Sequence, residues 1–263
     1  MQCLATTLQI LDDCGPPVRS AVSVRLKRLE SIQRKLRRTG ANFRLGTLDD
    51  VVGARIICQS VADLVALAGR IKLSPYFYRL KSYLTSPAET GYRGIHLIMR
   101  FAQPAAANRT LDVRFEIQVR TYLQHRWAVW SESHGEKVKI GQGDSVRHEE
   151  LRNASTEIAH WEMHNSSRVQ DDLFPYVGAC SVIVCWRPPH GRVISYPYLD
   201  NVGGAVAWLN DLESHYPAQR DCALLLVGVA EHAEVQRTLR LTHPLYVGAR
   251  AAHPRFYIPS NSS

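Results

Sequence analysis

Residues 111 to 121 alternate apolar and polar side chains without a break, which predicts a β-strand. The apolar positions share one face (Leu111, Val113, Phe115, Ile117, Val119). The polar positions share the other (Asp112, Arg114, Glu116, Gln118, Arg120). A face that carries a carboxylate among arginines can bind a polyanion together with a metal ion, because arginine binds phosphate and carboxylates bind Mg²⁺. A solvated polar face predicts the same alternation, so the pattern alone leaves both interpretations open.

The segment from Val22 to Arg38 fits an amphipathic helix, whose apolar residues recur at helical spacing (Val22, Leu26, Leu29, Ile32, Leu36). Lys27, Ser31 and Lys35 form an i, i+4, i+8 stripe that presents two ammonium groups and a hydroxyl together. We expect Arg25 at or just before the start of this helix, where its side chain can turn outward. A charged stripe is usually a solvated face, so by itself it identifies no site.

The order of predicted strands and helices after this segment indicates a mixed α/β domain that ends near residue 145. Asp50 stands at the mouth of a short β-rich run that starts at Val51. The predicted elements are a strand over 51–58, a helix over 61–71, a loop over 84–94, a strand over 95–101, the strand over 111–121 and a helix over 122–132.

A smaller α/β unit is predicted after a helix and connection over residues 146–170. Its expected strands cover 181–186, 192–198 and 221–229, and its expected helices 205–215 and 233–241. We find no catalytic constellation in residues 171–263, so packing, oligomerisation or partner binding is the simplest role. The predicted division is therefore 1–145, 146–170 and 171–263.

Charge is unevenly distributed along the 263 residues. Residues 1–150 contain 23 Lys and Arg against 14 Asp and Glu, whereas the remainder is nearly balanced. The basic residues are dispersed among apolar ones, which favours a lined anion-binding pocket over a basic tail. The six cysteines form no CxxC pair, and no leader or membrane-spanning run is evident. These features predict a cytoplasmic protein with reduced thiols and no membrane partner.

Five segments, in the same order as in the family, resemble the synthetase domain of RelA/SpoT proteins, a nucleotidyltransferase-like fold that transfers pyrophosphate from ATP to a nucleotide 3′-hydroxyl. Together they cover roughly residues 22–140 and are VRLKRLESIQRKL (24–36), DVVGAR (50–55), GYRGIH (91–96), EIQVRT (116–121) and LQHRWAVW (123–130). Each motif alone is weak, but five with compatible spacing are specific. The chain is similar to the stand-alone small alarmone synthetases.

The resemblance implies a role for each matched residue. Donor ATP would be bound by basic and hydroxyl side chains (Arg25, Lys27, Ser31, Lys35, Arg55, Arg120). Asp50 and Glu116 would hold Mg²⁺, with Glu116 also accepting the proton of the acceptor hydroxyl and Gln118 orienting phosphates. The acceptor would be bound by residues of the loop that contains Gly91 and Tyr92, called the Gly-Tyr loop below, and by their neighbours (Tyr92, His96, Arg79, Lys81).

One departure concerns the acceptor. In nucleotide-acting members a lysine usually follows the proline before the Gly-Tyr loop, but here Pro87 is followed by Ala88. GDP or GTP is the first expected acceptor, and the alternatives are the 3′ end of tRNA or an adenine nucleotide, as in the toxic branch of the family. If the protein is a toxin, an antitoxin protein is an expected partner. A homo-oligomer is compatible with a guanine-nucleotide synthetase and with a toxin. A non-catalytic nucleotide- or RNA-binding module is the third interpretation, against which the intact Asp50 and Glu116 speak.

Overall fold

The computed structural model describes fourteen stretches of the chain. They are residues 2–15, 20–26, 32–33, 36–37, 48–105, 109–134, 145–165, 181–186, 194–198, 207, 211, 224–229, 240–244 and 251–258. Within these stretches, no helix has both the length and the apolar character needed to cross a membrane.

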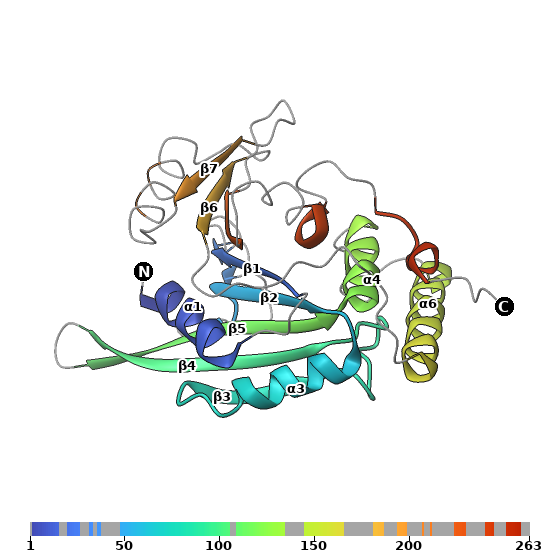
Figure 1. Cartoon of the computed structure of the whole chain (residues 1–263), viewed down its shortest axis with the longest axis horizontal. Helices are drawn as coiled ribbons and strands as arrows, with labels where there is room; N and C mark the ends of the chain where they lie inside the picture. Colours follow the sequence, from blue (N-terminus) through green and yellow to red (C-terminus); the bar gives the residue numbers. More distant parts are fainter. Residues whose placement is uncertain are drawn as a thin grey trace.

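A five-stranded mixed sheet forms the centre of the protein (Figure 1). Its strand order is β1 (Ala21–Leu26), β2 (Val52–Cys58), β5 (Arg109–Thr121), β4 (Ile95–Ala105) and β3 (Phe77–Ser82). The β2 and β5 strands run parallel, and the other neighbouring pairs are antiparallel. The long hairpin of β4 and β5 carries the alternating segment into the middle of the sheet.

Two helices cover one face of this sheet, α1 (Gln2–Cys14) and α3 (Val61–Ile71). The apolar positions of β5 point to this side, where Phe115, Ile117 and Val119 have no exposed surface. Cys58 lies in the same core as a free thiol, and burial raises its pKa to about 12. The polar positions of β5 therefore face the opposite side.

The helices α4 (Tyr122–Ser133) and α6 (Ser145–His164) pack against each other around a second apolar cluster. Helix α4 follows β5 directly, and Thr121 and Gln124 form a capping box at its start. The partly buried Glu162 of α6 accepts hydrogen bonds from Thr121 Oγ1 and from Gln124 Nε2 at 2.9 Å. This contact fixes α6 to the end of β5.

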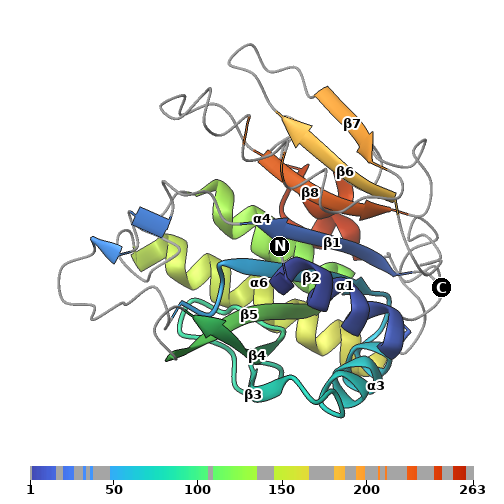
Figure 2. The same ribbon diagram turned by 90° about the vertical axis from the view of Figure 1, so that its left-hand side faces the viewer.

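A second sheet has the order β7 (Ile194–Tyr198), β6 (Ser181–Trp186) and β8 (Leu224–Val229), with both pairs antiparallel. Strand β8 lies beside β1 of the first sheet (Figure 2). A short 3₁₀ helix, η4 (Pro254–Tyr257), packs on α4 and α6. The predicted mixed α/β class is thus confirmed, whereas the domain division stays a prediction.

Most elements predicted between residues 51 and 164 are present, with ends shifted by a few residues. The helix predicted from Val22 is wrong at its start, because residues 21–26 form strand β1. Val22 and Val24 are buried in the core, so this segment follows the two-residue period with β-branched residues rather than the helical period. The α1 helix and β3 strand were not predicted, and the helices expected over 205–215 and 233–241 lie largely outside the described residues.

Candidate active site

Strand register aligns one polar row across all five strands of the first sheet. Ser23 of β1 pairs with Arg55 of β2, which pairs with Gln118 of β5. Gln118 pairs in turn with His96 of β4, which pairs with Lys81 of β3. Paired residues point to the same face of a sheet, so residues that are far apart in sequence meet on one surface.

A cavity of about 440 Å³ opens over this face. Glu116 lies on its floor opposite Gly53, which has no side chain, and Asp50 lies at the turn that leads into β2. The cavity is lined by residues from the first sheet, the Gly-Tyr loop, α4 and the C-terminal segment (Ser23, Asp50, Gly53, Ala54, Arg55, Tyr83, Ala88, Thr90, Tyr92, His96, Glu116, Gln118, Arg120, Trp127, Ala128, Ser131, Glu132, His243).

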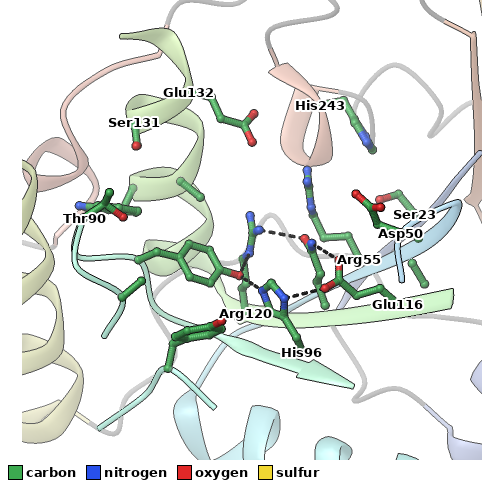
Figure 3. Close-up of a pocket in the computed structure, with 18 residues that line it drawn as sticks. Ser23, Asp50, Arg55, Thr90, His96, Glu116, Arg120, Ser131, Glu132 and His243 are labelled. Atoms are coloured by element: carbon green, nitrogen blue, oxygen red, sulfur yellow. Dashed lines mark hydrogen bonds and ion pairs between the residues drawn. The ribbon is translucent and has the colours of Figure 1, made fainter. Parts of the chain in front are cut away.

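Five side chains form a closed hydrogen-bonded ring on the cavity floor (Figure 3). On one side, Arg120 Nε donates to the Tyr92 hydroxyl at 2.9 Å, and that hydroxyl lies 2.5 Å from His96 Nε2. His96 Nδ1 lies 2.7 Å from Glu116 Oε1. On the other side, Arg120 Nη2 donates to Gln118 Oε1 at 2.8 Å, and Gln118 Nε2 donates to Glu116 Oε2 at 2.6 Å. Both oxygens of Glu116 are therefore oriented by neutral or cationic donors.

Electrostatics keep Glu116 ionised. Burial by itself raises the pKa of this carboxyl, as does the nearby charge of Asp50. The hydrogen bonds and charge of His96, together with Gln118, outweigh both effects and lower its pKa below the ordinary value. An ionised, nearly buried carboxylate is suited to hold a cation or to receive a proton.

The pair of carboxylates fits a divalent cation. Asp50 and Glu116 line the same cavity, and they are close enough for the charge of one to raise the pKa of the other. The described residues contain no cluster of three or more histidine, cysteine, aspartate or glutamate side chains that could hold a metal by itself. Mg²⁺ in proteins is usually bound by one or two carboxylates, with phosphate oxygens and water molecules as the remaining ligands.

Helix α6 holds the Gly-Tyr loop in place. The backbone of Gly91 has a φ of 94°, and a Cβ atom there would lie 3.2 Å from the Cα of Arg152 and from Ser155 Cβ. The buried Ser155 donates its hydroxyl to the Gly91 carbonyl at 2.5 Å and accepts from Arg93 Nε at 3.0 Å. Tyr92, which follows Gly91, is thereby set into the cavity.

The predicted acceptor residues separate into two groups. Tyr92 and His96 line the cavity, and Tyr83 contacts both rings edge-on with centroids 5.5 and 5.4 Å away. Arg79 and Lys81 do not line it, although they lie on the adjoining edge strand β3. Arg79 forms an ion pair with Asp49, and this carboxylate offsets part of the positive charge of Arg79.

The predicted donor residues are only partly described. Arg55 and Arg120 line the cavity. Arg25 lies in strand β1, not at a helix start, and its side chain is outside the described residues. The stripe residues also lie outside them (Lys27, Ser31, Lys35). The role of this stripe stays a prediction.

Sequence reasoning missed that the C-terminal part reaches the cavity. Arg55 Nη1 donates to the carbonyl of Thr242 at 2.8 Å, and the buried ring of His243 lines the cavity wall. Ser23 was missed as well, although the alternation from Ala21 to Leu26 could have placed it on the polar face. No sequence signal marks His243, because its approach depends on a contact across nearly two hundred residues.

His125 anchors this C-terminal segment. Its ring has no exposed surface, and its Nε2 lies 2.7 Å from the carbonyl of Leu241. Burial, followed by the charges of Arg55 and Arg120, lowers the pKa of His125 well below its ordinary value. The ring is therefore neutral and donates its Nε2 proton to the carbonyl.

This depressed pKa predicts acid sensitivity of the fold. The unfolded chain takes up a proton at His125 below about pH 6.5, but the folded chain does not. Stability should therefore fall as pH decreases below about 6.5, by about 1.4 kcal/mol per pH unit from this one group. In His125→Gln, an amide replaces the imidazole as donor and does not titrate. Denaturant unfolding of both proteins between pH 5 and 7.5 gives the free energy of unfolding at each pH, and below about pH 6.5 its slope against pH should be smaller in the variant by that amount. An equal slope in both proteins would contradict a neutral buried ring.

Comparison with known proteins places this site in a family. The region found in RelA/SpoT proteins matches residues 24–139, which contain the β2, β4 and β5 strands that carry the floor of the cavity. A curated relative is 30% identical to this chain over a stretch that covers 67% of the relative's length. The chain belongs to the RelA/SpoT family.

Two curated relatives come from Bacillus subtilis (strain 168). GTP pyrophosphokinase YwaC is 30% identical over 143 residues, which cover 52% of this chain and 67% of the relative. GTP pyrophosphokinase YjbM is 29% identical over 145 residues, which cover 51% and 68%. Among solved structures, small alarmone synthetase 1 from Bacillus subtilis bound to its product pppGpp is 26% identical, covers 54% of this chain and 74% of that chain, and has a TM-score of 0.46.

Proposed function

We propose that this protein transfers the pyrophosphoryl group of ATP to the 3′-hydroxyl of GDP or GTP. The observation that carries the proposal is the single cavity in which the ionised Glu116, Asp50 and Arg55 meet. The names of the relatives YwaC and YjbM, both GTP pyrophosphokinases, support the same reaction class.

The reaction needs a base beside an acceptor hydroxyl and positive charge beside the phosphates. The 3′-oxygen attacks the β-phosphorus of ATP, the bond from that phosphorus to the α,β-bridging oxygen breaks, and AMP leaves. Glu116 receives the hydroxyl proton, because His96 and Gln118 hold both of its oxygens in place. Arg55 and Arg120 lie on the same floor and would bind phosphate oxygens.

Asp50 and Glu116 would hold Mg²⁺ between them and the donor phosphates. When bound, the ion neutralises the charge that builds up on the transferred group. Asp50, which lies at the turn before β2, would hold the ion when Glu116 is engaged by the acceptor.

The acceptor nucleoside would occupy the end of the cavity lined by Tyr92, Tyr83 and His96. The Arg120 guanidinium lies 4.9 Å from the centroid of the Tyr92 ring and covers one of its faces. An acceptor base would therefore stack on the opposite face of Tyr92, close to the edge of Tyr83. With its base stacked there, the acceptor would have its ribose directed toward Glu116.

One observation favours a second acceptor class, the 3′ end of tRNA. Ala88 lines the cavity at the position where nucleotide-acting relatives of this type usually carry lysine, so a contact to the acceptor phosphates is missing. Arginine and lysine side chains on the neighbouring β3 edge, Arg79 and Lys81, would then contact a longer phosphate chain.

The deciding experiment is AMP release and label transfer from ATP that carries a labelled terminal phosphate. GDP, GTP, ATP and deacylated tRNA are offered in parallel with Mg²⁺. Label in a guanine nucleotide establishes the proposed reaction, and label in tRNA establishes the second. Label in no acceptor, with no AMP formed, would refute both.

Replacing Ala88 with lysine should increase the use of guanine nucleotides. Because Ala88 lines the cavity, the new ammonium group can reach the acceptor phosphates, and we expect the KM for GDP to fall about tenfold. The KM for ATP should change little. Steady-state kinetics with each substrate varied separately measures both values. Ser86→Lys, at an exposed position of the same loop, is the matched control for the added charge. An unchanged acceptor profile in Ala88→Lys would remove the argument from the missing lysine.

A further inference from the structure

Ser23 places a hydroxyl in the cavity that no described residue satisfies. Its side chain is 1% exposed, lines the cavity and finds no hydrogen-bond partner among the described residues. A buried hydroxyl without a partner costs about 1–3 kcal/mol of stability. Such a group in a cavity wall is explained if a ligand supplies the missing bond.

The position of Ser23 relates this hydroxyl to the donor side of the site. Ser23 pairs across the strands with Arg55, so both side chains rise from neighbouring points of the same face. Asp50 lies beside them in the cavity (Figure 3), whereas Thr90 and Ser131 lie at the other end. The hydroxyl thus faces the corner where we place the phosphates of ATP.

The C-terminal segment 240–244 closes this corner. It is anchored through two backbone carbonyls, that of Leu241 to His125 and that of Thr242 to Arg55. Both contacts are buried or partly buried, and Thr242 has no exposed surface. They bring the ring of His243, itself 5% exposed, to the cavity wall above Ser23 and Asp50.

We propose that Ser23 and His243 form a subsite for phosphate oxygens of the nucleoside triphosphate donor. This inference rests on the proposed function and adds two binding residues to it. His243 Nδ1 lies 2.9 Å from Thr242 Oγ1 and accepts from that hydroxyl, which leaves the proton on Nε2. The Ser23 hydroxyl and the Nε2–H of His243 donate hydrogen bonds to the phosphate chain, and the neighbouring Arg55 supplies positive charge. Residues 240–244 are thereby a wall of the donor site, although they lie outside the matched range of 24–139.

Ser23→Ala tests the subsite, and Ser20→Ala is its matched control. Ser20 also carries a buried hydroxyl without a partner among the described residues, three positions earlier, but it does not line the cavity. Titration calorimetry with a non-hydrolysable ATP analogue and Mg²⁺ should show about tenfold weaker binding in Ser23→Ala and unchanged binding in Ser20→Ala. The Tm of Ser23→Ala should stay the same or rise, because the lost hydroxyl has no internal bond.

His243→Asn extends the test to the C-terminal segment. It should weaken binding of the ATP analogue by a similar factor and leave the KM for the acceptor unchanged, whereas His160→Asn on the exposed face of α6 should change neither. Wild-type affinity in both Ser23→Ala and His243→Asn would overturn the subsite, and so would tighter binding in His243→Asn, because the segment would then obstruct the donor. If the wild-type protein itself bound no ATP analogue, the proposed function would fail together with this inference.

Discussion

Glu116→Gln should reduce pyrophosphate transfer by about a thousandfold while nucleotide binding stays within a few-fold of wild type. The amide has the size of the carboxylate, and its oxygen can still accept the hydrogen bond from His96 Nδ1, whereas its nitrogen cannot accept from Gln118 Nε2, so one hydrogen bond of the ring is lost. It can neither receive the acceptor proton nor contribute negative charge to a metal site. AMP release under single-turnover conditions measures the chemical step, and calorimetry with an ATP analogue measures binding.

Glu157→Gln on the exposed face of α6 is the control for the same change of charge elsewhere, and it should retain full activity. If Glu116→Gln lost donor affinity by the same factor as turnover, Glu116 would act by holding the donor and its metal. Turnover within tenfold of wild type would contradict its role as the base.

Gly91→Ala should destabilise the protein by about 2–4 kcal/mol and raise the KM for the acceptor more than tenfold. The φ of 94° is strained for any L-residue, and the new methyl group would press on the backbone of α6 at Arg152 and Leu151, with 3.2 Å to each. The loop can relieve this contact only by moving away from α6, which carries Tyr92 out of position. Denaturant unfolding and steady-state kinetics test the two effects separately.

Gly69→Ala is the matched control for this substitution. Gly69 lies inside α3, and a Cβ atom there would have no neighbour within 4 Å. Alanine favours the helix, so this variant should be more stable by about 0.5–1 kcal/mol with unchanged kinetics. A Gly91→Ala protein as stable as wild type would show that the loop does not depend on its close approach to α6.

The elements that sequence patterns predicted well are those whose environment is uniform along their length. Strand β5 alternates because one face packs on α1 and α3 while the other lines the cavity, and α3 was predicted with its observed ends. Residues 22–26 were assigned to a helix because Val22 and Leu26 satisfy the helical spacing as well as the two-residue period. Over so few residues the two periods are not distinguishable, and pairing with β2 decides between them.

The residues of the candidate site were also predicted in part from the sequence. Motif resemblance named Asp50, Arg55, Tyr92, His96 and Glu116, and the structure brings all five to one cavity. It also named Arg79 and Lys81, which lie beside the cavity but do not line it. Their roles in binding and catalysis stay predictions, which the variants above test.

The sequence by itself determined the mixed α/β class, the alternating strand that carries Glu116 and the family to which the chain belongs, because these depend on local periodicity and on ordered motifs. Only the tertiary structure decided that Ser23, Arg55, Gln118 and His96 form one row, since strand register is set by packing across the whole sheet. The same holds for His243. Its place in the cavity wall results from hydrogen bonds to backbone carbonyls, which leave no pattern in the side chains of the sequence.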